Sequence, residues 1–309
     1  MKNPVIIGGA AVDLKGIPGA PLKPGASNLG VLRKSTGGVG LNIALNLAAL
    51  GLEPVFISIV GDDSEGDFIT QRCRAAGLAT DRITRQAGEA TAVYEAILDE
   101  HGELFAGISA MSIFERLTPA FLAPHADLIA QAPLVVMDAN PPAETAAWLA
   151  ALCRDAGTPL WMEPTAFDTC GRLRDHLAGV SWISPNVEEL EALAGRSVGS
   201  ADEMIDAARA LLGRGVKEVF VTCGEGGILH VRDGAADTAR TPVIAARDVT
   251  GAGDAFVAGT AYGLLQGMAS TRALRYGMAA AYLTVQVSAS VHPGLTPALL
   301  EQTVRESFA

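Results

Sequence analysis

A glycine-rich segment that leads into apolar, helix-like sequence carries the chemistry that is easiest to interpret. It reads Asp248-Val-Thr-Gly-Ala-Gly-Asp254, and apolar residues then recur at helical spacing as far as Leu265. The first N–H groups of a helix have no partner within the helix, and the helix dipole adds partial positive charge there. A turn almost free of side chains therefore predicts a place where a phosphate can reach those groups.

Asp254 follows this turn directly, where its carboxylate would repel a phosphate at rest. The placement makes chemical sense if the carboxylate accepts a proton from a hydroxyl that attacks a phosphoryl group held by Gly251, Ala252 and Gly253. We therefore interpret the segment as the centre of a kinase. An ordinary helix with an aspartate in its first turn would give the same letters, because turns of small residues often precede helices.

A second glycine turn lies upstream and also leads into helical sequence. It reads Gly37-Gly-Val-Gly40, and Asn42 falls in the first turns of the expected helix. Backbone N–H groups and an amide can bind hydroxyls, and Asp13, expected at the end of the first strand, could accept from two vicinal hydroxyls of a sugar. Plain helix-start chemistry explains the glycines equally well. The candidate acceptor-binding residues here are Asp13, Ser27, Asn28, Gly38, Val39 and Asn42.

Two further turns follow expected strands in the second half of the chain. Asn186 and Glu189 stand at i and i+3, which suits a helix capping box and equally a pair that organises Mg²⁺ and its waters. The segment Thr222–Gly227 is a glycine loop that could admit phosphates or a ribose beside bare backbone. The sequence contains no GxxxxGK[ST], and no GxGxxG follows the first strand, so neither of those nucleotide-binding motifs is present.

The elements that must position these residues alternate along the chain. Strands are expected at 5–7, 55–60, 134–137, 160–162, 182–183 and 219–222, and helices near 39–50, 64–76, 142–156, 187–194, 201–213, 252–266 and 271–287. This alternation predicts βαβ units with right-handed crossovers and a mostly parallel sheet covered on both faces. Ligands bind outside the carboxyl ends of such strands. The polar residues expected there are Asp13, Asp62, Asp138, Glu163, Asn186 and Thr222.

Two segments break the alternation. Residues 14–36 are rich in Gly, Pro, Ser and Lys, and residues 91–107 indicate two strands around a turn at Glu100–Gly102. Because phosphoryl transfer needs water excluded, we expect a small β-lid over the site in preference to a surface hairpin on an edge strand. Neither segment is large enough for a core of its own, so residues 1–309 are expected to form one kinase domain.

Composition narrows the class of protein. A net charge of -11 over 309 residues argues against nucleic-acid or membrane-surface binding as the main function. The four cysteines are scattered without a CxxC pair, which favours free thiols over zinc ligands or disulfides. No apolar run approaches about 18 residues and no signal peptide is recognised, so a cytoplasmic enzyme is expected.

In this order, four motifs resemble those of the ribokinase-like (PfkB-type) family of carbohydrate and nucleoside kinases. They are Gly37-Gly-Val-Gly-Leu-Asn42, Asn186-Val-Glu-Glu189, Thr222-Cys-Gly-Glu-Gly-Gly227 and Asp248-Val-Thr-Gly-Ala-Gly-Asp254. The resemblance implies a three-layer αβα fold with a mostly parallel central sheet and a small β-lid that often serves as a dimer clasp. It implies a kinase that uses ATP and Mg²⁺ on a small sugar or nucleoside, and a homodimer formed through the lid.

The resemblance also implies a role for each motif. Asp254 would be the base that activates the acceptor hydroxyl, and the N–H groups of the preceding turn would form the anion hole. Asp248 and Thr250 match positions that in many members help bind a monovalent cation, which predicts an activity that rises with K⁺. The nucleotide and its Mg²⁺ would be held by Asn186, Glu189, Thr222, Gly224 and Gly227.

Within this family the chain looks most similar to the pseudouridine kinases. The similarity lies in Ser27–Gly30, Gly102–Leu104, the Met111 region, Asp138–Asn140 and Glu163–Thr165. It predicts phosphorylation of the ribose 5′-hydroxyl of pseudouridine or a related nucleoside. The polar residues expected around the nucleobase are Ser27, Asn28, Thr91 and Glu163.

Two positions depart from the pseudouridine kinase pattern. Ala110 stands where that subfamily tends to have Asp, and Thr169 where it tends to have Lys. A kinase for a free ribose- or fructose-like sugar therefore stays open as an alternative. A hydrolase that activates water through Asp254 is disfavoured by the lack of a di-metal carboxylate cluster, and a non-catalytic sugar or nucleotide sensor is disfavoured because Asp254 is intact.

Overall fold

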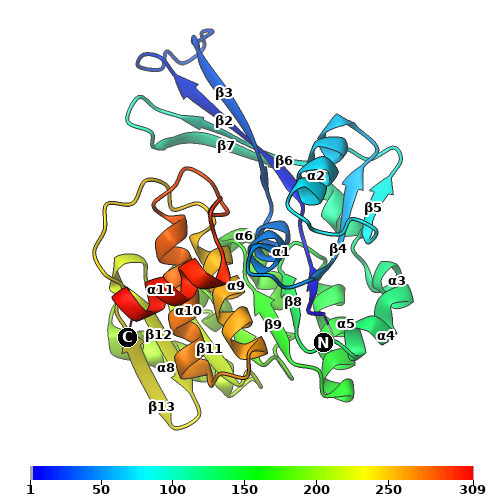
Figure 1. The fold of residues 1–309 in the computed structure, drawn as a ribbon, viewed down its shortest axis with the longest axis vertical. Helices are drawn as coiled ribbons and strands as arrows, with labels where there is room; N and C mark the ends of the chain where they lie inside the picture. The colour runs from blue at the N-terminus through cyan, green and yellow to red at the C-terminus, as the bar shows by residue number, and fades with distance from the viewer. Residues whose placement is uncertain (1–2, 309) are drawn as a thin grey trace.

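The computed structural model describes residues 3–308, which form two sheets with helices around them (Figure 1). The larger sheet has the strand order β13-β12-β11-β10-β9-β8-β1-β4-β5. Its strands are parallel except for β12, which runs antiparallel to both β11 and β13. They are β1 Val5–Ile7, β4 Val55–Gly61, β5 Ile83–Gln86, β8 Val135–Asp138, β9 Leu160–Glu163, β10 Trp182–Ile183, β11 Glu218–Thr222, β12 Ile228–Arg232 and β13 Ala235–Ala239.

Helices cover both faces of this sheet because successive strand residues point to opposite sides. In β1, Ile6 belongs to one hydrophobic core, while Val5 and Ile7 belong to the other. The first core lies under α1 Val39–Ala49, α2 Ser64–Ala75, α9 Ala252–Leu265, α10 Ser270–Thr284 and α11 Pro297–Ser307. The second lies under α3 Pro119–Leu122, α4 Ala126–Ala130, α5 Ala143–Ala156, α7 Val187–Ala194 and α8 Ala201–Leu212.

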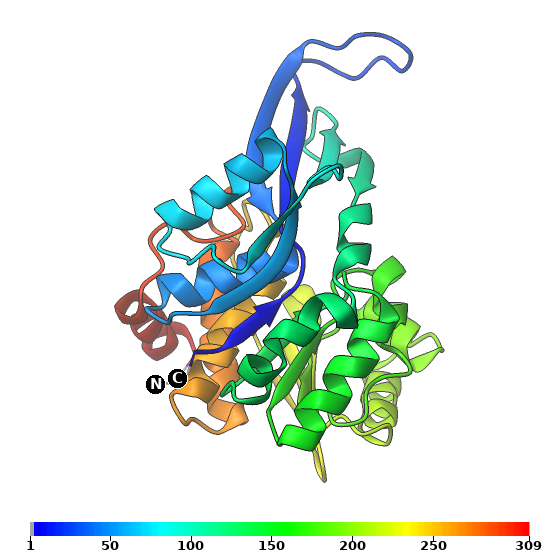
Figure 2. The same cartoon turned by 90° about the vertical axis from the view of Figure 1, so that its right-hand side faces the viewer.

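These elements confirm the three-layer prediction. Figure 2 shows the C-terminal helices, in orange and red, on one side of the sheet and the green helices on the other. A short helix, α6 Phe167–Cys170, follows β9 near the edge where the parallel strands end. No helix among residues 3–308 is both long enough and apolar enough to cross a membrane.

The smaller sheet is the expected lid, with the strand order β3-β2-β6-β7. The strands are β2 Ala11–Pro18, β3 Gly30–Gly37, β6 Ala92–Leu98 and β7 Leu104–Ala110. The central pair β2–β6 is parallel, and the two outer pairs are antiparallel. β1 runs towards this sheet, so the carboxyl ends of the parallel strands face the lid (Figure 1).

The position expected for Asp13 is wrong in one respect. The first strand of the main sheet ends at Ile7, and Asp13 is the third residue of the lid strand β2. The reason is a break in the strand at Gly8 and Gly9, where the chain bends from one sheet to the other. Asp13 therefore belongs to the lid.

Helix α9, which carries Asp254, packs on α10 through residues without side chains. Gly259 lies against the backbone of Tyr276 and Gly277, and Gly263 lies against Ala273. A Cβ atom at Gly259 would collide with the Tyr276 carbonyl oxygen. The close approach of the two helices therefore depends on these glycines, and it holds the start of α9 in position.

We predict that Gly259→Ala lowers the free energy of unfolding by about 1–3 kcal/mol because it overpacks this contact. Alanine would otherwise stabilise a helix relative to glycine. Gly171→Ala is the matched control, because a Cβ atom there meets nothing within 4 Å. Urea unfolding followed by circular dichroism measures both variants, and equal stabilities would contradict the close contact.

Candidate active site

The turn before α9 has the open shape expected of an anion site. Gly251 caps the helix at φ 81° and ψ 0°, and a Cβ atom there would overlap the backbone of Ser290. The Ala252 N–H donates to the Val249 carbonyl oxygen at 3.2 Å, which closes the turn. A Cβ atom on Gly253 would meet nothing within 4 Å, so the space outside the helix N-terminus is free. The turn therefore has room for a phosphate at a favourable helix end.

Asp254 lies in the first turn of α9, where only 8% of its surface is exposed. Its Oδ2 accepts a hydrogen bond of 2.7 Å from the Asn42 side-chain amide. Asn42 comes from α1, which begins after Gly38 at φ 94°, a position where a Cβ atom would clash with Gly9. The structure thus joins the two glycine turns that the sequence singles out. The Asn42 Oδ1 is buried and has no hydrogen-bond partner among the described residues.

Burial raises the pKa of Asp254 to about 7. The hydrogen bond from Asn42 lowers this pKa, while nearby Asp138, Asp13 and Glu189 raise it further. Burial also raises the pKa of Asp13 to about 6. A carboxylate with a pKa close to neutral can accept a proton near physiological pH, which is the property a general base needs.

Two carboxylates hold together the region where the acceptor is predicted to bind. Asp138, at the end of β8, accepts from the N–H groups of Gly9 at 2.8 Å and Gly40 at 2.9 Å, and so fixes the strand break to the start of α1. Asp13 lies against Gly37, where a Cβ atom would overlap its carboxylate. The sequence placed Asp138 at a strand end but indicated nothing of this bracing role.

Asn186 and Glu189 form the capping box that their spacing allows. The Asn186 N–H donates to Glu189 Oε2, and the Glu189 N–H donates to Asn186 Oδ1, each at 2.9 Å. Asn186 also forms a parallel bridge with Thr222, so the ends of two strand segments meet there. The capping interpretation is confirmed, while the role of this pair toward Mg²⁺ stays a prediction.

Glu163 lies at the end of β9 and is 7% exposed. Its carboxylate accepts a hydrogen bond from the Ser184 hydroxyl. Burial raises its pKa well above the usual value, and the charges of Glu189 and Asp254 raise it further. Glu163 therefore lies close to both of these carboxylates. Residues 3–308 contain no group of three or more His, Cys, Asp or Glu side chains arranged to hold a metal ion.

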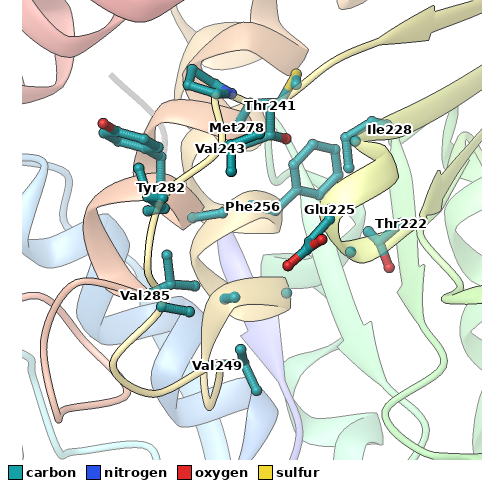
Figure 3. Close-up of a pocket in the computed structure, with 18 residues that line it drawn as sticks. Thr222, Glu225, Ile228, Thr241, Val243, Val249, Phe256, Met278, Tyr282 and Val285 are labelled. Carbon is teal, nitrogen blue, oxygen red and sulfur yellow. The ribbon is translucent and has the colours of Figure 1, made fainter.

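A cavity of about 350 Å³ adjoins the N-terminal end of α9. The predicted nucleotide residues Thr222, Gly224 and Gly227 line it, together with Ala252 and Gly253 of the predicted anion-hole turn. Its apolar walls, shown in Figure 3, were not recognised in the sequence, because helical periodicity does not distinguish a pocket wall from a core. They include Ile228, Val243, Val249, Phe256, Met278, Tyr282 and Val285.

Of four further predicted acceptor residues, Asn28, Thr91 and Val39 make contacts elsewhere within the chain, and Ser27 is exposed. Ser27 and Asn28 lie exposed in the turn between β2 and β3, where Asn28 bonds the backbone of Lys23. Thr91 accepts from the Gly61 N–H at 2.8 Å and donates to Asp63 at 2.6 Å, which fastens β6 to the start of α2. Val39 packs against the core. Within a single copy of the protein, Ser27 and Asn28 do not lie beside Asp254.

Asp248 and Thr250 contact a lysine that sequence reasoning missed. Lys15 Nζ lies 2.9 Å from Asp248 Oδ2 and 3.3 Å from Thr250 Oγ1. Lys15 belongs to β2 and stands two residues after Asp13, so both side chains point to the same face of the lid. The only signal in the sequence is this i, i+2 spacing in a strand.

Comparison with known proteins agrees with a kinase site at the start of α9. Residues 1–296 match the model of the pfkB family of carbohydrate kinases. The pseudouridine kinase of Escherichia coli K12 is 30% identical over 94% of this chain and 93% of its own length. The guanosine-inosine kinase of Exiguobacterium acetylicum is 30% identical over 97% of this chain and 99% of its own.

A solved structure supports the fold. Arabidopsis thaliana ribokinase, complexed with ribose and ATP, superposes with a TM-score of 0.88 at 24% identity, and the match covers 98% of this chain and 99% of that one. The ribokinase-like α/β fold with its lid is therefore confirmed. The roles of the individual site residues stay predictions, and the role of Asp254 can be tested through its titration.

Phosphoryl transfer at this site is expected to fall as the pH drops through about 7, because protonated Asp254 cannot accept a proton. Asn42→Ala removes the hydrogen bond that lowers this pKa, so the acid limb of kcat/KM should move to higher pH. Thr145→Val, which removes a buried hydrogen bond to the Leu117 carbonyl, is the control and should leave the limb in place. An acid limb near the ordinary pKa of aspartate, about 4, would count against this assignment.

Proposed function

This chain belongs to the pfkB family of carbohydrate kinases, and we propose that it transfers the γ-phosphoryl group of ATP to a hydroxyl of a nucleoside or sugar. The observation that carries the proposal is the environment of Asp254. It is a buried carboxylate with a pKa of about 7, beside an open helix N-terminus and an apolar cavity. This arrangement suits a base that acts next to a bound phosphoryl group.

In this mechanism Phe256 and Tyr282 of the cavity would bind the adenine, and Gly253 would lie beside the phosphates. The acceptor lies on the side of Asp13 and Asn42, under the lid. Asp254 takes the proton of the attacking hydroxyl while the helix N-terminus stabilises the charge of the transferred group. The lid excludes water, which would otherwise compete as the acceptor.

Mg²⁺ fits the donors in this region, because it prefers oxygen ligands, keeps several waters and is usually held by one or two carboxylates plus substrate phosphates. Glu189 is the carboxylate that would hold it, and the charge of Glu189 raises the pKa of the nearby Glu163. When bound with ATP, the ion neutralises the negative charge of the phosphates. Asn186 would position Glu189 through the capping box.

The more specific proposal is that the acceptor is pseudouridine, phosphorylated at its ribose 5′-hydroxyl. The similarity to the Escherichia coli pseudouridine kinase over nearly the whole chain supports this substrate. Among the polar residues predicted to bind the nucleobase, Glu163 also lies near Asp254. The alternative is a free ribose- or fructose-like sugar, since Ala110 and Thr169 lack the side chains of the pseudouridine kinase pattern.

We also propose a homodimer that forms through the lid, in a cytoplasmic enzyme that draws on cellular ATP. Leu32, Ile97 and Ile108 lie on one face of the lid by register and are 74%, 41% and 69% exposed. Large exposed apolar residues gathered on one face are typical of a protein interface. A second copy of the lid would cover them.

The role of Asp254 predicts that Asp254→Asn lowers kcat by roughly 10²–10⁴-fold, the usual contribution of a positioned general base. The amide keeps the size of the side chain but cannot accept the proton. Binding of ATP, measured by calorimetry, should change little. Turnover at the wild-type rate would remove Asp254 from the mechanism.

The substrate proposal predicts that kcat/KM for pseudouridine exceeds that for uridine, inosine, ribose and fructose. A site that hydrogen-bonds a substrate group can reject an analogue lacking that group by about 10⁴-fold. ADP release measured with the five acceptors in one buffer gives the ranking. If a free sugar wins by about tenfold or more, equivalent to 1.4 kcal/mol of transition-state binding, the pseudouridine assignment fails and the kinase assignment stands.

A further inference from the structure

The pair formed by Lys15 and Asp248 links the lid to the anion-hole loop. Lys15 lies on the lid strand β2, and Asp248 precedes the turn at Gly251. Each carboxylate oxygen of Asp248 already has a donor, because Oδ1 accepts from the Thr250 N–H at 2.9 Å and Oδ2 from Lys15. Both side chains are about three-quarters buried, at 26% and 25% exposure. The ion pair is therefore held in a defined geometry.

The negative charges of Asp13 and Asp248 favour a cation at the position of the Lys15 ammonium. The charge of Asp248 raises the pKa of Asp13, and the charge of Lys15 lowers it, so Lys15 offsets the repulsion that Asp248 exerts on Asp13. In the proposed reaction, the phosphates of ATP bring further negative charge to the neighbouring turn. A positive charge next to Asp248 and Thr250 would stabilise this arrangement in the same way whether it belongs to an ion or to a side chain.

We propose that the Lys15 ammonium is a built-in monovalent cation, which makes the activity independent of K⁺. This inference rests on the proposed kinase function. The sequence predicts K⁺ at Asp248 and Thr250, but the residues as arranged do not fit it, because an ammonium already contacts both side chains. An alkylammonium has the charge of K⁺ and a similar size, and it binds the same oxygen atoms.

The ion pair between Lys15 and Asp248 also couples two parts of the site. Lys15 and Asp13 are two residues apart on one face of β2, so any movement of the lid displaces both. When the lid closes, the Lys15 ammonium would therefore reach the anion-hole turn at the same time as the Asp13 carboxylate reaches the acceptor. An ion that exchanges with solvent would bind independently of lid closure.

The test removes the charge and offers K⁺ in its place. Lys15→Met keeps most of the side-chain stem and leaves space next to Asp248, while Lys34→Met is the matched control. Lys34 is also a lid lysine in an ion pair, with Glu65 on α2 at 3.2 Å. Rates of ADP formation are measured in K⁺, Na⁺ and tetramethylammonium at constant ionic strength.

The wild type and Lys34→Met should have the same rate in all three salts. Lys15→Met should lose roughly 10–100-fold in tetramethylammonium, the contribution of a hydrogen bond to a charged group, and K⁺ should restore much of that loss. A wild-type rate that rises several-fold with K⁺ would overturn the proposal. An equal loss of Lys15→Met in all salts would also overturn it, since Lys15 would then not act as a replaceable cation.

A second readout does not depend on catalysis. The Tm of Lys15→Met should be higher in K⁺ than in tetramethylammonium, because an ion that binds the folded state stabilises it. The Tm values of the wild type and Lys34→Met should not differ between these two salts. If no acceptor is phosphorylated by any variant, the kinase proposal fails, while the Tm comparison still decides whether Lys15 occupies a cation site.

Discussion

The hydrogen bond between Asn42 and Asp254 is the constraint on which the rest of the site depends. It joins the first turns of α1 and α9, which lie 212 positions apart in the sequence. Each helix begins at a glycine with positive φ, so each N-terminus can approach a ligand without a side chain in the way. Asp138 then ties the start of α1 to the strand break at Gly9. The two helix starts that we propose bind the acceptor and the phosphates are thereby held at a fixed spacing.

Much of this arrangement could be predicted from the sequence, because buried parallel strands read as short apolar runs between helical patterns. The six strands expected in the main sheet all occur within a residue or two of their predicted bounds, from β1 to β11. The glycine turns were recognisable because a backbone that must approach a ligand closely needs small residues, and a run of small residues before a helix is visible in the sequence. The same reasoning predicted that Asn42 and Asp254 each lie in the first turns of a helix that follows a glycine turn, but it did not predict the hydrogen bond between them.

The remainder depends on contacts that no local pattern records. Lys15 and Asp248 are separated by 233 positions, and a lysine in a strand usually indicates a solvated face. Asp13 was expected on the wrong strand because the break at Gly8 and Gly9 moves the chain between sheets. The hairpin of β12 and β13 did carry a signal, the Asp233-Gly234 turn, which sequence reasoning overlooked.

The glycine beside Asp13 has a consequence for how such sequences diverge. Gly37 does not need positive φ; it is required because a Cβ atom would occupy the place of the Asp13 carboxylate, and Gly8 stands in the same relation to Asp138. A homologue with alanine at either position cannot keep the corresponding acid where it is here. These two glycines therefore report on the geometry of distant acidic residues, and they can be read even where an alignment leaves the acids themselves ambiguous.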